Sequence, residues 1–151
     1  MANLQRECIL SASGPFFHFI RHGTPNNFLS GANANYSVIP IKGRLDAKTA
    51  IFSAVSEALS FPDYFGENWD AFDECLNDLS WLPAKGYILN LEHADDLLVL
   101  PKDDLKIFFA VLSKAIHNWQ EEKKPLHVVF IGSDALFQKL KELIDKEICF
   151  H

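Results

Sequence analysis

The chain has 151 residues, 48% of them hydrophobic, and a formal net charge of −6 at pH 7. This length and apolar content suffice for one domain with a packed core. The negative charge disfavours phosphate backbones and anionic lipid, so we expect no nucleic-acid or membrane partner and favour a basic protein instead.

The cysteines and the N-terminal segment indicate the compartment. Cys8, Cys75 and Cys149 are an odd number without framework spacing, which favours reduced thiols. Charge interrupts the short apolar run before residue 14, so a signal peptide is not expected. No apolar run approaches membrane-spanning length. We therefore expect a cytoplasmic protein, a single domain over residues 1–151 that is monomeric when free.

The first half of the chain predicts two strands and a helix. Pro15–Arg21 is short, aromatic and β-prone, and is predicted as a strand. A loop rich in Gly, Asn and Ser leads to a second strand at Tyr36–Lys42, where Pro40 indicates a sheet edge or a bulge because it cannot donate to a ladder. Apolar residues at helical spacing then predict a helix over Asp46–Leu59, with Asp46 as a candidate cap.

The second half continues this alternation of strands and helices. It is predicted to contain a helix at 68–79, a strand at 87–91, a loop at 92–100, a helix at 101–119, a strand at 126–131 and a helix at about 134–147. The joins are too long for hairpins, so the strands are expected to pair in parallel. The fold class is therefore α/β, with a small and mostly parallel sheet.

The helix at 68–79 has two contrasting faces. Asn68 is the predicted N-cap, and Gly66 would allow a left-handed turn before it. At about 100° per residue, one face is apolar and is predicted to be core. Its members are Trp69, Phe72, Cys75, Leu76 and Leu79. The opposite face carries Asp70, Glu74 and Asp78, with Asp73 beside them.

This helix and the turn before it concentrate negative charge. Six acids lie between Asp63 and Asp78, with no Lys or Arg among them. Like charges at i, i+4 repel, and Asp78 lies near the negative end of the helix dipole. Tyr64 and Phe65 form an expected aromatic rim. These acids could form an acidic face that is simply solvated. Aromatic residues beside carboxylates that have no nearby Lys or Arg in the sequence instead favour a surface that binds a basic partner.

The segment LSFPDYFGENWDAFDECLNDL is similar to the signature of the barstar family, bacterial intracellular ribonuclease inhibitors. The matching positions are Pro62, Asp63, Tyr64, Phe65, Gly66, Glu67, Asn68, Trp69, Asp70, Ala71, Glu74, Cys75 and Leu76. Upstream, VIPIKG and the helix after it fall at the family's spacing. Downstream, YILNL, a helix and LHVVFI follow its order of elements. The resemblance covers Tyr36 to about Gly132.

The resemblance implies a fold. It would be a barstar-like three-stranded parallel sheet packed by helices, with a family-like core at about 36–132. Residues 1–35 would add an N-terminal extension with an extra strand, and the helix at about 134–147 would follow the core.

The resemblance also implies a function in binding rather than in catalysis. Family members bind a basic ribonuclease stoichiometrically, and carboxylates on this helix stand in for RNA phosphate. The implied partner is a basic ribonuclease or RNase-type toxin, to which this chain would be an immunity protein. No cofactor and no metal is expected.

The implied partner contacts can be placed on this sequence one by one. They are Tyr64, Asn68, Trp69, Asp70, Asp73, Glu74, Asn77, Asp78 and Leu79. Two positions depart from the family: Glu74 stands where its best-known member has the principal aspartate, and Asp73 stands where that member has tryptophan. A further family glutamate on the third helix lacks a counterpart, and Lys114 is expected nearby.

Two alternatives use other residues or partners. Arg21-His22-Gly23 after a strand resembles the start of the histidine phosphatase superfamily, in which the histidine accepts a phosphoryl group. The second histidine of that chemistry is missing, since the late strand continues into Ile131-Gly132. A barstar-like scaffold that binds some other basic protein is the other alternative. Metal binding is not expected because the histidines other than His22 show no HxxxH spacing and the cysteines show no CxxC spacing.

Overall fold

A computed structural model describes residues 11–24, 36–62, 66–144 and 147–151. These residues form an α/β structure around one five-stranded, all-parallel sheet with strand order β2-β3-β4-β1-β5. The strands are β1 (Phe17–Arg21), β2 (Tyr36–Ile41), β3 (Gly86–Leu91), β4 (Leu126–Gly132) and β5 (Ile148–Phe150).

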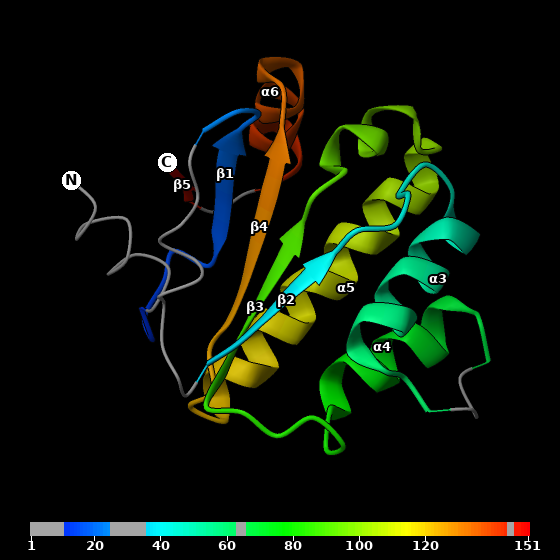
Figure 1. The fold of residues 1–151 in the computed structure, drawn as a ribbon, viewed down its shortest axis with the longest axis vertical. Coiled ribbons are helices and arrows are strands. Elements are labelled where there is room, and N and C mark those ends of the chain that lie inside the picture. The colour runs from blue at the N-terminus through cyan, green and yellow to red at the C-terminus, as the bar shows by residue number, and fades with distance from the viewer. Residues whose placement is uncertain (1–10, 25–35, 63–65, 145–146) are drawn as a thin grey trace.

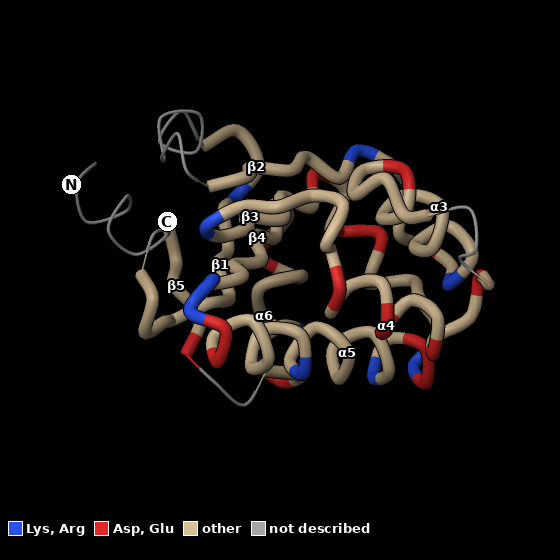
Figure 2. Tube along the Cα trace, turned by 90° about the horizontal axis from the view of Figure 1, so that it is seen from below, with Lys and Arg blue, Asp and Glu red and all other residues tan. Residues whose placement is uncertain are grey.

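The helices lie mainly on one side of the sheet. They are α3 (Lys48–Leu59), α4 (Trp69–Asp78), the 3-10 helix η1 (Ala94–Val99), α5 (Lys102–Glu121) and α6 (Asp134–Leu143). Figures 1 and 2 show α4, α5 and α6 on one face, with α3 toward the β2 edge. No helix of the described part of the chain is both long and apolar enough to cross a membrane.

The main core fills the space between the sheet and these helices. Phe19, Tyr87 and Phe130 of the strands and Phe72 and Phe108 of the helices are all at most 1% exposed. A smaller cluster of Ile20, Ile88 and Val129 is buried on the opposite face of the sheet. His18 and His127 are buried as well.

The predicted fold class is confirmed. Strands β2, β3 and β4 form the three-stranded parallel unit, and β1 joins it as the predicted extra strand beside β4. β2 is an edge strand with Pro40 exposed, as expected for a residue that cannot donate to a ladder. The structure adds β5, which the sequence does not predict, and α6 ends at Leu143 rather than at about residue 147.

Four local predictions are wrong. Residues 92–100 contain η1 rather than only a loop. Asp46 does not cap α3, since its carboxylate lies 3.8 Å from Arg44 Nη1 and Ala47 takes the cap position without a side-chain bond. The left-handed turn before α4 is made by Glu67, with φ of 52°, and not by Gly66. Cys149 is disulfide-bonded rather than reduced, to a partner outside the described residues, while Cys75 is a free thiol.

Candidate partner-binding surface

Helix α4 begins where the sequence predicts. Asn68 has extended backbone, and its side-chain Oδ1 accepts a hydrogen bond of 2.8 Å from the Ala71 N–H. This bond satisfies one of the N–H groups that lack a partner in the first turn. At the other end, Leu79 adopts a left-handed conformation with φ of 47° and donates its N–H to Cys75 O. Both ends of α4 are therefore fixed by its own residues.

The inner face of α4 is anchored by aromatic packing. Phe72 is fully buried, and its ring lies 5.7 Å from those of Phe52 and Trp69 and 6.3 Å from that of Phe108. Trp119 of α5 donates its indole N–H to Leu76 O at 2.9 Å. Since aromatic contacts and a buried hydrogen bond hold the helix from behind, its outer face is presented on a rigid support.

The outer face carries a row of free carboxylates. Asp70, Glu74 and Asp78 are exposed and lie one turn apart. None of the three forms an ion pair with any residue that the structure describes. Burial, and then the charges of Asp78 and Glu74, raise the pKa of the Cys75 thiol behind them. Acidic positions gather around α4 in Figure 2. We call Asp70, Glu74 and Asp78 the carboxylate row.

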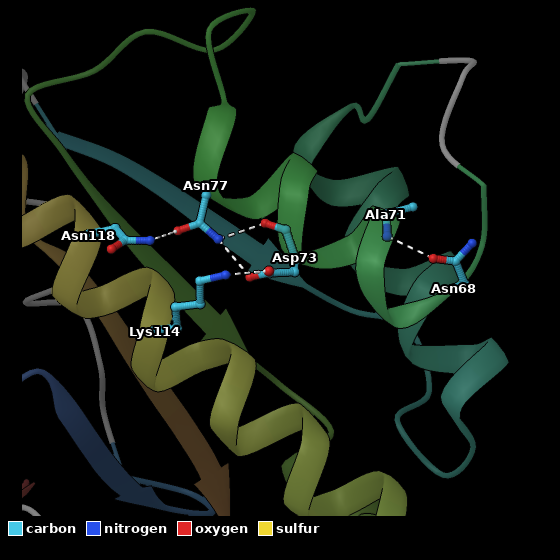
Figure 3. Close-up of polar contacts among 6 residues, drawn as sticks. All are labelled: Asn68, Ala71, Asp73, Asn77, Lys114 and Asn118. Atoms are coloured by element: carbon cyan, nitrogen blue, oxygen red, sulfur yellow. Dashed lines mark hydrogen bonds and ion pairs between the residues drawn. The ribbon is translucent and has the colours of Figure 1, made fainter.

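Asp73 lies beside the carboxylate row but is held by neighbours. Lys114 Nζ of α5 lies 2.7 Å from Asp73 Oδ2, and Asn77 donates from Nδ2 to Asp73 Oδ1 at 2.8 Å. Asn118 donates in turn to Asn77 Oδ1 at 2.8 Å, so α4 and α5 are joined by a continuous polar network (Figure 3). The hydrogen bond to Asp73, and then its charge, raise the pKa of Lys114. The expectation that no cation pairs with the acids of this helix is therefore wrong at Asp73.

The structure separates the predicted contact residues by exposure. Asn68 and the carboxylate row are exposed. Trp69, Asp73 and Asn77 are half-buried, and Trp69 packs against the core as its helical angle predicts. Leu79 is 1% exposed, so its side chain belongs to the core. Tyr64 lies outside the described residues.

We predict that Asn68→Ala lowers the free energy of unfolding by about 1 kcal/mol, because the Ala71 N–H loses its acceptor. Urea denaturation followed by tryptophan fluorescence measures this change. Asn68→Asp is the matched control and keeps the stability near that of the wild type, since aspartate caps equally well. Equal losses for the two variants would contradict the capping role.

The Arg21-His22 motif lies at the C-terminal ends of β1 and β4, apart from α4. Arg21 Nε donates to Asp134 Oδ1 at 2.8 Å, and His22 Nε2 lies 3.0 Å from Asp95 Oδ2. Burial raises the pKa of Asp95, but hydrogen bonds from the Ser133 N–H and hydroxyl, and then from His22, outweigh it and leave that pKa lowered. The two side chains that would hold or accept a phosphate are thus already paired with the carboxylates of Asp134 and Asp95. This geometry does not favour phosphoryl transfer.

Fold and surface together define a parallel α/β protein that presents a rigid, carboxylate-bearing helix at its outside. The family model described as Barstar (barnase inhibitor) matches residues 38–131, well over half of the chain. The chain belongs to the barstar family, whose members are inhibitors and not enzymes. The match runs from β2 to β4 and leaves β1, α6 and β5 outside it. A search of curated proteins finds no match.

Proposed function

We propose that this protein is a stoichiometric inhibitor of a basic ribonuclease or RNase-type toxin, and acts as an immunity protein in the bacterial cytoplasm. The carboxylate row on α4 is the observation that carries the proposal, because three exposed acids without described ion pairs lie within the family-matching segment. Within the helix only Asp70, in the first turn, is favoured by the dipole, whereas Glu74 and Asp78 repel each other. All three carboxylates would be stabilised by a basic cleft of a partner.

The proposed mechanism is mimicry of RNA phosphate. Arginine and lysine side chains that would hold the substrate bind the carboxylates through charge-assisted hydrogen bonds. The aromatic packing behind α4 fixes the row before the partner arrives, which reduces the entropy lost on binding. The net charge of −6 speeds the encounter with a basic partner.

The proposed contacts are the nine residues that the resemblance implies, with unequal roles. Asp70, Glu74 and Asp78 carry the charge, and Asn68 and Trp69 border them. Asp73 and Asn77 contribute less because each is already hydrogen-bonded to α5 or to the other. Leu79 is buried, so it contacts a partner through its backbone alone. The contact proposed for Tyr64, which lies outside the described residues, rests on the resemblance.

We further propose that residues 1–151 form one domain that is monomeric when free. The single sheet supports this, because β1 pairs with β4 of the family core and β5 pairs with β1. The added strands therefore extend the core sheet and do not build a second one.

The function is tested by capture and inhibition. The tagged protein is used to capture partners at low and at moderate salt, and mass spectrometry identifies them. We expect a basic ribonuclease that is lost as salt rises, and stoichiometric inhibition of its RNA cleavage. Capture of a basic protein without nuclease activity would favour the scaffold alternative instead, particularly where the neighbouring reading frame encodes no toxin.

We predict that Lys114→Met strengthens binding to the captured ribonuclease several-fold. The substitution releases Asp73 and removes a cation beside the carboxylate row, and breaking an ion pair with a solvent-exposed lysine costs the fold little. Lys106→Met on the same helix is the matched control, since it removes an equal charge that has no ion pair among the described residues. Isothermal titration measures both affinities. Weaker binding of Lys114→Met would show that Lys114 contacts an acid of the partner.

A further inference from the structure

Three histidines form a hydrogen-bonded chain on the sheet face opposite the main core. His127 Nε2 lies 2.8 Å from Ser11 O, and His127 Nδ1 lies 2.8 Å from His18 Nε2. His18 Nδ1 then lies 3.0 Å from His151 Nε2. His18 and His127 are fully buried, and burial is the first cause that lowers their pKa values, to about 2 and about 4. Both rings are therefore neutral at pH 7.

The backbone carbonyl of Ser11 sets the proton positions along this chain. A carbonyl only accepts, so His127 carries its proton on Nε2 and accepts at Nδ1. His18 must then donate from Nε2, which leaves the lone pair of its Nδ1 directed toward β5. A neutral imidazole whose other nitrogen donates to a fixed acceptor is the arrangement that orients metal-binding histidines.

Strand β5 brings two more candidate ligands to the same place. It pairs in parallel with β1 at the edge opposite β2 (Figure 1), and Cys149 is the register partner of His18. His151 follows two residues later, and its N–H donates to Phe19 O at 3.0 Å. Because side chains alternate along a strand, Cys149 and His151 share a face. One ligand atom each from His18, Cys149 and His151 lies within 4.8 Å of the others.

We propose that the reduced protein binds one Zn²⁺ through His18 Nδ1, Cys149 Sγ and His151 Nε2. Two nitrogens on a tetrahedral zinc ion lie roughly 3.3 Å apart, given bond lengths of about 2.0–2.1 Å. The two imidazole nitrogens are already 3.0 Å apart, so a small widening admits the ion. Nitrogen and thiolate ligands suit Zn²⁺, and the fourth position is left for water or a further ligand.

The disulfide of Cys149 makes this site dependent on redox state. A thiol reductant supplies two electrons and two protons, which split the disulfide into Cys149 thiol and the thiol of its former partner, while the reductant becomes a disulfide. Zn²⁺ then displaces the proton of the Cys149 thiol, and the proton that His151 Nε2 donates to His18 Nδ1 moves to His151 Nδ1, which frees both facing nitrogens for the metal. Because one sulfur cannot serve in both bonds, zinc binding and the disulfide exclude each other.

The proposal is tested by metal titration of the full chain. The protein is freed of metal with a chelator and reduced with a phosphine, and Zn²⁺ is titrated against a chromophoric competitor. Co²⁺ as a spectroscopic probe reports sulfur ligation through its thiolate charge-transfer band. Thermal unfolding with and without Zn²⁺ provides a readout independent of any partner. Cys149→Ser and His151→Ala are the test variants, since neither residue is fully buried, and His93→Ala, at an exposed histidine outside the cluster, is the matched control.

We expect one Zn²⁺ per reduced chain, a thiolate band with Co²⁺, and a rise in melting temperature on adding Zn²⁺. Cys149→Ser and His151→Ala lose at least about tenfold in affinity and lose the melting shift, whereas His93→Ala retains both. The oxidised wild type also loses the tight site. The proposal is overturned if the reduced chain binds no stoichiometric Zn²⁺, or if both test variants bind it as the wild type does.

Discussion

Replacing Asp70 and Glu74 together by alanine is expected to weaken binding to the captured ribonuclease by about 1,000-fold or more. Each carboxylate in the centre of a charged interface is worth on the order of 2 kcal/mol when removed, and every 1.4 kcal/mol corresponds to about tenfold in affinity. Both side chains are exposed and lack ion pairs with described residues, so their removal leaves the fold intact. Isothermal titration and RNA cleavage assays measure the loss.

The matched control removes two acids elsewhere. Glu142→Ala with Glu147→Ala lowers the negative charge equally, at exposed residues far along the chain from α4. We expect it to slow association slightly through the weaker long-range field, with little change in affinity. If both double variants bind alike, only net charge matters and the proposed role of the carboxylate row is wrong.

Phe72→Ala is expected to lower the free energy of unfolding by about 3–5 kcal/mol. The substitution opens a cavity at a fully buried ring that contacts aromatic residues of α3, α4 and α5. A domain of this size is stable by only about 5–15 kcal/mol, so the loss is a large part of the total. Chemical denaturation followed by circular dichroism gives the value.

Phe150→Ala serves as the comparison for this variant. It deletes the same ring from β5, where Phe150 is 47% exposed, and the loss is expected to be clearly smaller. Partner binding measured at low temperature, where Phe72→Ala remains largely folded, shows whether a poorly supported α4 still holds the carboxylate row in place. Similar losses of stability for the two variants would contradict the assignment of Phe72 to the centre of the core.

Helix α4 illustrates what local sequence rules can predict. Its cap at Asn68, its buried face and its carboxylate row all follow from spacing along a single helix, and the structure agrees with each. Asp73 illustrates the limit. Its partner Lys114 is 41 residues away on another helix, and no periodicity within α4 indicates that contact.

The additions outside the family match were harder to predict. β5 has three residues and is too short for a clear alternation, so its place beside β1 depends on tertiary pairing alone. The histidine chain was missed for a related reason. Metal-binding motifs that a sequence can reveal have ligands a few residues apart, such as HxxxH. His18 and His151 are 133 residues apart and meet only because β1 and β5 are neighbours in the sheet.

The strand order β2-β3-β4-β1-β5 has a consequence for the newly made chain. β1 leaves the ribosome before the other four strands but finds its strand partners only after β2 and β3, when β4 and β5 emerge. The unit from β2 to β4 pairs over shorter separations and can assemble earlier, since closing a shorter loop costs less entropy. Until then β1 is an apolar segment without its sheet, so ribosome-bound chains that stop before β4 are expected to depend most on chaperones.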